Sequence, residues 1–287
     1  MKEHNNKFMD IVRHLRESKS ATLGAIVILL LCLIAVFAPQ LSPNNPTMAC
    51  LDDRLISPLT VPEYPLGTDH LGRCILSRLL YGARISLMVG IIVVGISAMI
   101  GITLGVISGY YGGVIDAVIM RFVDATLSFP SIFLAVTIAG LLGRGLPSVI
   151  IALIIVDWTA YARISRGSVL SLKEKEFVES ARSLGASDCY IMTRHILPNI
   201  IGPVIVIGTL GMAYVILSAA ALSFLGFGPQ PPTPEWGAML NAGRMYMRTE
   251  PYLTIIPGFA IMVMVLAFNL LGDGLRDILD PRKTVIE

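Results

Sequence analysis

The sequence predicts an all-α polytopic membrane protein with six transmembrane helices. Of its 287 residues, 54% are hydrophobic and only 15% are charged, and the mean hydropathy is +0.73. A soluble domain carries roughly 25% charged residues. Several apolar runs reach the ~20 residues that a helix needs to cross a bilayer. Short polar segments rich in turn residues separate these runs.

Six expected spans follow in chain order. They cover residues 21–38, 85–108, a third stretch that ends near residue 142, and then 148–164, 200–225 and 252–271. The first is interpreted as an uncleaved anchor, because its apolar run is long, no A-x-A site appears and Pro39 follows at once. Pro130 lies inside the third span and is expected to kink it.

The polar segments divide the chain into regions. These are a tail at 1–20, the anchor at 21–38, an outer loop at 39–84, a core at 85–275 with five spans, and a second tail at 276–287. The first tail is either an amphipathic helix on the membrane surface or a partly ordered segment. The end of the outer loop, with Ile75 and Leu79 on one helical face, predicts an interfacial helix before the second span. Farther on, Thr233 is expected to cap a short helix that begins at Pro234.

The distribution of Lys and Arg sets the orientation. With the N-terminus inside, the inner segments hold 15 of these residues and the outer segments hold 7. Cytoplasmic loops of membrane proteins carry an excess of Lys and Arg. Both termini and the segment 165–199 are therefore predicted to lie in the cytoplasm.

That cytoplasmic segment contains a predicted helical hairpin. Phe177, Ala181 and Leu184 share one face of its first helix. A second, charged face is formed by Glu176, Glu179 and Arg182. Gly185 follows directly and can take the left-handed conformation found just past helix ends. Ser187 is expected to cap a second helix, which Pro198 should end at Leu197.

The hairpin resembles a known motif. Glu179-Ser180-Ala181, with Gly185 six residues after the Glu and Ile196-Leu197-Pro198 farther on, is similar to the cytoplasmic "EAA" loop of permease subunits in binding-protein-dependent ABC importers. The resemblance implies a type I ABC importer permease fold and a loop that docks on an ATP-hydrolysing subunit. The implied docking residues are Glu176, Glu179, Ser180, Ala181, Arg182, Gly185, Ile196 and Pro198. Ser180 departs from the family, which has Ala more often, but serine is small enough to preserve the docking shape. The alternative is a plain solvated hairpin.

Two further segments narrow the resemblance. The run PLGTDHLGRCILSRLLYGARISL at 65–87 and the closing run GDGLRDILDPRK are similar to the C-type permeases of dipeptide, oligopeptide and nickel importers. Cys74 stands where that family commonly has Asp. The resemblance, from about 65 to 283, implies a multi-pass protein of a prokaryotic inner membrane. A role of the 65–87 segment in contacting the substrate-binding protein stays open.

The resemblance also implies the partners and the activity. The partners would be a second, homologous permease, one or two ATP-binding subunits that use ATP and Mg, an extracytoplasmic solute-binding protein and the lipid bilayer. The chain would then form the translocation pathway for di- or oligopeptides. A permease for nickel or a metal chelate is the alternative, and an ATP-independent secondary transporter is the rival from another class. Such a transporter usually shows internal repeats, and none is convincing here.

Two groups inside the spans are candidates for function or packing. Asp157 is an ionisable residue in the fourth span, which by default suggests function. It could line the substrate pathway and meet a cationic group, or it could form a structural hydrogen bond to a neighbouring helix. In the second span, small residues recur every four positions and favour close helix packing. They are Ser97, Gly101, Gly105 and Gly109.

Several chemistries have no motif in the sequence. There is no GxxxxGK[ST] phosphate loop, no GxSxG and no HExxH, so the chain is not expected to be an enzyme or to bind ATP itself. The four Cys contain no CxxC pair, and the four His lack metal-ligand spacing. A disulfide between Cys50 and Cys74 stays open. We expect no metal site, no bound cofactor and no nucleic-acid partner, since the basic residues are spread over the loops.

Overall fold

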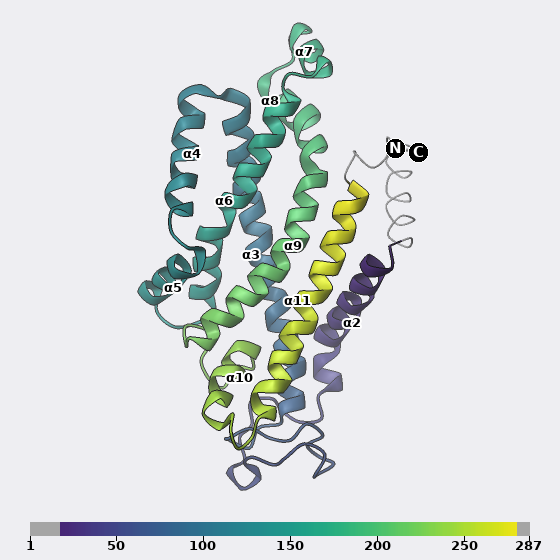
Figure 1. Cartoon of the computed structure of the whole chain (residues 1–287), viewed down its shortest axis with the longest axis vertical. Coiled ribbons are helices and arrows are strands. Elements are labelled where there is room, and N and C mark those ends of the chain that lie inside the picture. The colour runs from purple at the N-terminus through teal and green to yellow at the C-terminus, as the bar shows by residue number, and fades with distance from the viewer. Residues whose placement is uncertain (1–17, 280–287) are drawn as a thin grey trace.

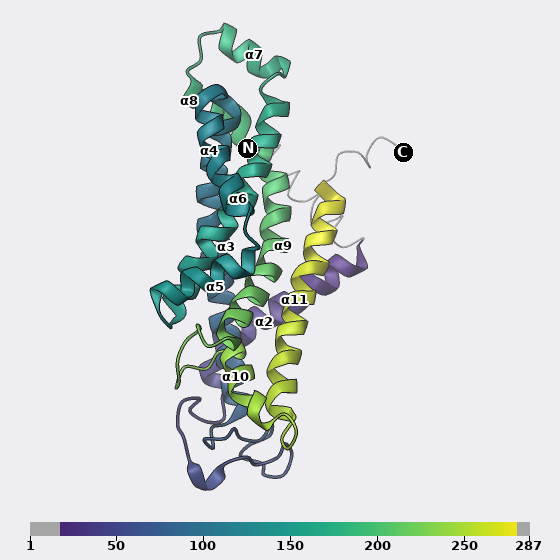
Figure 2. The ribbon, with the colours of Figure 1, turned by 60° about the vertical axis from the view of Figure 1, so that its left-hand side comes forward.

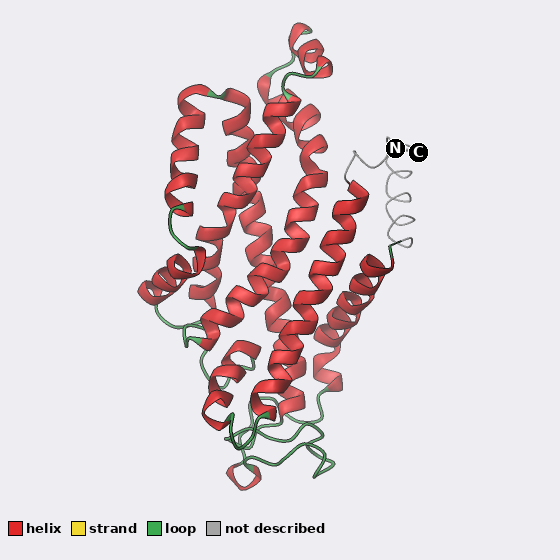
Figure 3. Ribbon diagram, in the orientation of Figure 1, coloured by secondary structure: helices red, strands yellow, loops and turns green. Residues whose placement is uncertain are grey.

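The protein is an elongated bundle of helices, as the computed structural model of residues 18–279 shows (Figure 1). Residues 1–17 and 280–287, including most of the expected surface helix, lie outside the described residues. Within the described part every regular element is helical (Figure 3), and the all-α prediction is confirmed. Between residues 18 and 279, five helices are long and apolar enough to cross a membrane, and a sixth span results if one bent helix pair is counted as a single span.

Five long helices run along the bundle. They are α2 (Lys19–Leu41), α3 (Ile75–Tyr111), α6 (Leu146–Leu172), α9 (Leu197–Phe224) and α11 (Tyr252–Leu279). Helix α3 packs along α6, and α11 lies between α9 and α2 (Figure 1). The end that carries α7 (Glu176–Ser183) and α8 (Asp188–Ile191) is called the hairpin end. The opposite end, which carries residues 42–74 and α10 (Trp236–Gly243), is called the loop end (Figure 2).

The expected third span is two helices rather than one kinked helix. Helix α4 (Gly113–Leu127) and α5 (Ser131–Leu142) meet at an angle of 89°. Pro130 is the N-cap of α5. Because proline has no N–H and restricts the residue before it, α4 cannot continue through this point. Helix α5 consequently turns out across the bundle axis (Figure 2).

The prediction that Pro198 ends the second hairpin helix is wrong. The chain stays helical from Asp188 to Phe224, because residues Met192–Ile196 form one turn of π-helix. In this wider turn the N–H of Leu197 bonds to the carbonyl of Met192. Pro198 then sits in the first turn of α9, where a missing N–H costs little, and the side chain of Asn199 donates to the carbonyl of His195 at 2.6 Å.

Three other boundaries differ from expectation. Helix α2 continues past Pro39 to Leu41, and the N–H of Ser42 still bonds to the carbonyl of Ala38. Helix α3 begins at Ile75, inside the stretch predicted as an outer loop, so the expected interfacial helix is the first part of a 37-residue helix. Glu235, not Thr233, caps α10: its carboxylate accepts from the N–H groups of Gly237 and Ala238, both at 2.8 Å.

Helix α10 is fixed to the bundle through Trp236. This side chain is 1% exposed, and its Nε1 donates to the carbonyl of Leu79 at 3.0 Å. Gly82 makes room for the indole, since a Cβ there would lie 2.4 Å from the ring. The buried indole thus joins α10 to α3, and it contributes a large apolar area to the core at the loop end.

Candidate functional site

The hairpin formed by α7 and α8 projects beyond the bundle between α6 and α9 (Figures 1 and 2). Gly185 has φ +80°, as expected of a residue just past a helix end. The N–H of Ala186 bonds to the carbonyl of Ala181 at 3.1 Å, and that of Gly185 to the carbonyl of Arg182 at 3.0 Å. These two bonds form a Schellman motif, which fixes the angle at which the chain leaves α7. Ser187 then caps α8 through the N–H of Tyr190.

Helix α7 packs on the protein through Val178 and Ala181, so the apolar face noted in the sequence is only partly covered. Val178 is fully buried, in a cluster with Val106, Val169 and Ile196. Phe177 is 41% exposed and Leu184 is 88% exposed. The helix therefore holds to its own chain through Val178 and leaves an apolar surface free, beside exposed charged residues. Those charged residues are Glu176, Glu179 and Arg182.

The hairpin is fastened to the end of α3. The hydroxyl of Tyr110 donates to Asp188 Oδ1 at 2.7 Å, and the guanidinium of Arg182 lies 5.8 Å from the centre of the Tyr110 ring. Lys173 Nζ donates to the carbonyl of Gly109 at 3.1 Å. The hairpin is therefore linked to α3 through these contacts, as well as to α6 and α9 through the chain itself.

A partly buried ion pair links α4 to α6 near the hairpin. Arg166 donates from Nε and Nη2 to the two carboxylate oxygens of Asp116, at 2.5 and 2.7 Å. Ser108 Oγ donates to the same carboxylate at 2.5 Å. Bidentate pairs of this kind set a definite geometry. The sequence does not reveal this pair, because Arg166 lies 50 positions from Asp116 and no local spacing joins them.

Three of the four small residues of α3, the glycines, lie where that helix meets α6. A Cβ on Gly101 would be 2.3 Å from the carbonyl oxygen of Trp158, and one on Gly105 would be 2.4 Å from that of Ala162. At Gly109 the nearest atom would be Cβ of Val169, at 2.8 Å. Ser97 is fully buried. The backbones of α3 and α6 thus approach too closely for any larger side chain along this face.

Asp157 lines a hollow of about 400 Å³ between α6, α9 and the break that separates α4 from α5. Tyr161, Gly211 and Tyr214 line the same hollow. Gly211 makes room for Tyr161, whose hydroxyl would lie 2.7 Å from a Cβ at that position. The alternative of a structural hydrogen bond is not realised, because the carboxylate of Asp157 has no hydrogen-bond or ion-pair partner between residues 18 and 279.

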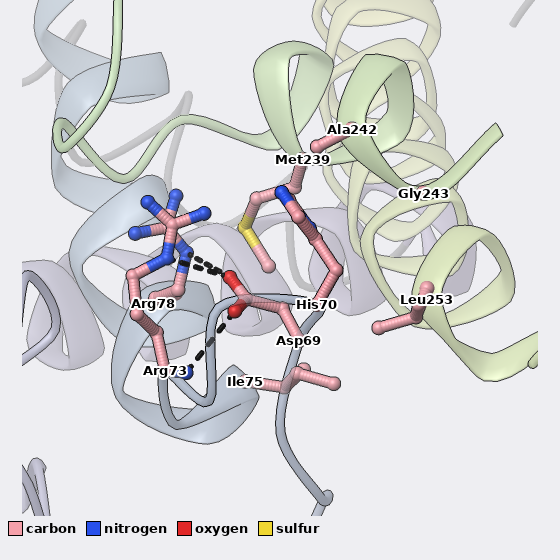
Figure 4. A pocket seen from close by; sticks show the side chains of 9 residues that line it. All are labelled: Asp69, His70, Arg73, Ile75, Arg78, Met239, Ala242, Gly243 and Leu253. Atoms are coloured by element: carbon pink, nitrogen blue, oxygen red, sulfur yellow. Dashed lines mark hydrogen bonds and ion pairs between the residues drawn. The ribbon is translucent and has the colours of Figure 1, made fainter. Parts of the chain in front are cut away.

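A second polar cluster, which sequence analysis did not single out, lies at the loop end. Asp69 Oδ1 accepts from the N–H groups of Leu71 and Arg73, at 2.9 and 3.0 Å. Its Oδ2 lies 2.7 Å from Arg73 Nε and 3.6 Å from Arg78 Nε. Figure 4 shows both guanidinium groups converging on this one carboxylate. Both arginine side chains are 4% exposed, so the cluster holds two positive charges and one negative charge out of water.

Arg78 also ties two distant loops together. Its Nη1 donates to the carbonyls of Pro46 and Pro232, at 3.0 and 3.1 Å. His70 stacks on Tyr246 with ring centres 5.6 Å apart. Burial lowers the pKa of His70, and its Nδ1 has no partner among the described residues. No local spacing points to this cluster, because Arg73 and Arg78 are five positions apart and only folding brings Pro46 and Pro232 to Arg78.

The described residues contain neither a metal-ligand group nor a disulfide. Between residues 18 and 279 no group of three or more His, Cys, Asp or Glu side chains could hold a metal ion. All four cysteines, Cys50 and Cys74 included, are free thiols in the structure.

Comparison with known proteins supports the fold and the family. Residues 101–285 match the model of the "Binding-protein-dependent transport system inner membrane component" family, and residues 7–58 match that of the "N-terminal TM domain of oligopeptide transport permease C". The inward-facing methionine ABC transporter MetNI has a TM-score of 0.58 and 17% identity, over 71% of this chain and 97% of that one. This similarity shows the ABC permease fold.

Relatives of known name are similar over nearly the whole chain. The dipeptide transport system permease protein DppC of Alkalihalophilus pseudofirmus is 45% identical over 94% of this chain and 88% of the relative. The glutathione transport system permease protein GsiD of Pectobacterium atrosepticum is 46% identical, over 94% and 89%. DppC of Haemophilus influenzae is 41% identical, over 94% and 92%. The chain therefore belongs to the family of binding-protein-dependent transport inner membrane components, the non-catalytic membrane-spanning part of systems that also contain a binding protein and an ATPase.

Proposed function

We propose that this chain is a permease subunit of an ATP-driven importer and forms part of the pathway by which di- or oligopeptides cross the cytoplasmic membrane. The observation that carries the proposal is the α7–α8 hairpin. It projects from the bundle, exposes Phe177 and Leu184, and is fastened to three long helices. The relatives named for dipeptide and glutathione transport support peptide-like substrates over nickel.

The hairpin serves as the docking site for an ATP-binding subunit in this proposal. An exposed apolar residue beside charges suits a protein interface better than free solvent. Closure of the ATP-binding subunits around ATP and Mg would shift α7 as a rigid body. The Tyr110–Asp188 hydrogen bond and the helices α6 and α9 then carry this shift toward the hollow at Asp157.

The same proposal orients the chain. The hairpin end, the start of α2 and the end of α11 point to the cytoplasm, and the loop end faces outward (Figure 1). The 15 to 7 distribution of Lys and Arg supports this orientation. A second, homologous permease completes the pathway, one or two ATP-binding subunits drive it, and an extracytoplasmic binding protein delivers the solute.

Asp157 is proposed to face the substrate. Its carboxylate lines an open hollow and has no partner in the described chain, so it can meet the cationic amino terminus of a peptide. A carboxylate in a membrane span is costly, so its presence there favours a functional role.

Uptake by cells that lack this gene tests the proposal. Complementation should restore uptake of a labelled dipeptide, and should leave uptake of labelled nickel unchanged. Restored nickel uptake without dipeptide uptake would contradict the peptide assignment. In detergent extracts the chain should also co-purify with an ATPase, and a chain that transports alone would indicate a secondary transporter instead.

A further inference from the structure

We infer that the loop end contains a binding site for a carboxylate group, anchored by Arg73 in a hollow of about 420 Å³. Besides Arg73, the hollow is lined by Arg78, Arg144 and Arg244, and is called the arginine hollow below. It is separate from the hollow at Asp157, with which it shares no lining residue. The choice of a peptide carboxylate as the ligand rests on the proposed import of peptides.

The first argument is charge. Four arginines line the arginine hollow, and its lining residues include no Asp or Glu. The nearby Asp69 offsets one of these charges, through Arg73 Nε. Neither Arg144 nor Arg244 forms an ion pair with a described residue. A concave surface with several uncompensated positive charges concentrates anions.

The second argument is the state of Arg73. Its side chain is 4% exposed, but its terminal nitrogens are not among the buried atoms without a partner, so they reach the open space of the hollow that Arg73 lines. Nε is bound to Asp69, whereas its two terminal nitrogens have no hydrogen-bond partner within residues 18–279. Free donors of a largely buried guanidinium are available to an ionised partner, and hydrogen bonds between two charged groups are stronger than those to neutral ones. Two terminal N–H groups in a planar fork match the two oxygens of a carboxylate.

The third argument is shape. The walls come from elements far apart in sequence: the turn before α3, the α5–α6 turn with Arg144, and the segment from Gly226 through α10. Gln230 and Asn241 add neutral amide groups to the lining. Sites for small ligands are hollows of roughly 300–1,000 Å³ with a few placed polar groups. The arginine hollow is in this range and suits a solute of peptide size rather than a flat protein surface.

Binding to the assembled transporter tests the inference. The complex of this chain with its partner subunits is placed in lipid nanodiscs without the binding protein, and labelled peptides are added in equilibrium dialysis. Ala-Ala and N-acetyl-Ala-Ala, which keep the carboxylate, should bind. The C-terminal amide of Ala-Ala should bind at least about tenfold more weakly, because it lacks the charge that the fork recognises.

Two substitutions separate binding from folding. Arg73→Gln should weaken binding about tenfold or more, but it also removes a bond that holds the Asp69 turn. Arg144 is exposed and has no partner in the described chain, so Arg144→Gln should leave folding unchanged and still weaken binding about threefold or more. Arg248 lies at the same end outside the hollow, and Arg248→Gln is the control that should change nothing.

Three outcomes would overturn the inference. The acid and the amide of Ala-Ala could bind equally, or Arg144→Gln could bind like the wild type. In the third outcome, free peptides do not bind, but Arg144→Gln lowers the affinity of the transporter for the binding protein. The hollow would then hold a carboxylate side chain of that protein and not a peptide. Dipeptide uptake by cells is measured in parallel. Uptake without carboxylate-dependent binding contradicts only this site, whereas binding without uptake contradicts the proposed function.

Discussion

The two ends of the molecule differ in what they expose and what they bury. At the hairpin end, α7 buries Val178 and leaves Phe177 and Leu184 at the surface. At the loop end, Trp236 and two arginines are buried, and the loops are tied to one another by Asp69 and Arg78. One end exposes apolar surface that a partner can cover, and the other hides polar groups that a ligand can complete. The first arrangement suits transmission of motion, and the second suits recognition.

The middle of the bundle connects the two ends by close packing rather than by polar contacts. Along α3 the glycines at positions 101, 105 and 109 bring α6 into backbone contact. Two helices packed in this way leave little room for one to slide on the other. Four substitutions test this picture of two different ends joined by a tightly packed centre.

The largest effect is expected from Gly185→Val at the hairpin end. Gly185 has φ +80°, which costs an L-residue roughly 1–2 kcal/mol and a β-branched one more. The Schellman turn should be lost and α7 displaced, so co-purification of the ATPase and dipeptide uptake should both fall by at least about tenfold. Membrane insertion should be unchanged. Gly202→Ala, where nothing lies within 4 Å, is the control. Normal uptake by the valine variant would show that the hairpin does not depend on this turn.

A somewhat smaller effect is expected in the tightly packed centre from Gly105→Val. The new Cβ would lie 2.4 Å from the carbonyl oxygen of Ala162, so α3 and α6 must separate. Overpacking of this kind costs about 1–3 kcal/mol. Thermal unfolding in detergent should show a lower midpoint than for Gly95→Ala, a change on the same helix at a site with open space. Equal midpoints for the two variants would mean that the contact is not tight in the membrane.

The hollow at Asp157 offers a sharper, chemical test. Asp157→Asn should reduce uptake of a dipeptide with a free amino terminus about tenfold, since hydrogen bonds to charged groups contribute about 1.5–3 kcal/mol. Uptake of an N-acetylated dipeptide, which lacks the cation, should not respond. Asp124→Asn, in an exposed pair with Arg163, is the matched control. If uptake of both peptides is unchanged at several pH values, the pathway role of Asp157 is wrong.

The smallest effect is expected at the loop end, from the pH response of His70. Burial lowers its pKa below the usual 6.5; the neighbouring Arg73 and Arg78 act in the same direction, and Asp69 opposes them. The unfolded chain thus binds a proton more readily than the folded one. The stability that neutral His70 contributes is present above pH 6.5 and decreases as the pH falls through the lowered pKa. His70→Asn should flatten the difference between melting curves at pH 5 and pH 7, and an unchanged difference would exclude His70 as its source.

The sequence alone determined the helical class, the apolar spans and the hairpin. Hydrophobic length and local capping carry these features, because a span needs only consecutive apolar residues and a cap needs only its near neighbours. Gly185 and Ser187 accordingly have the roles expected of them. Local rules failed at two positions. The helix continues through Pro198 because a π turn precedes it, and Glu235 caps α10 in place of Thr233 because its carboxylate reaches two free N–H groups.

Only the tertiary structure decided what lies beside what. The pairing of Asp116 with Arg166, the packing of Val178 rather than Phe177, and the meeting of Arg73, Arg144 and Arg244 in one hollow join residues far apart in the chain. No local pattern encodes such contacts, because their partners are chosen by the packing of whole helices. The break at Pro130 shows the same division: the proline predicted a disturbance, but only the structure shows that two helices meet there at an angle of 89°.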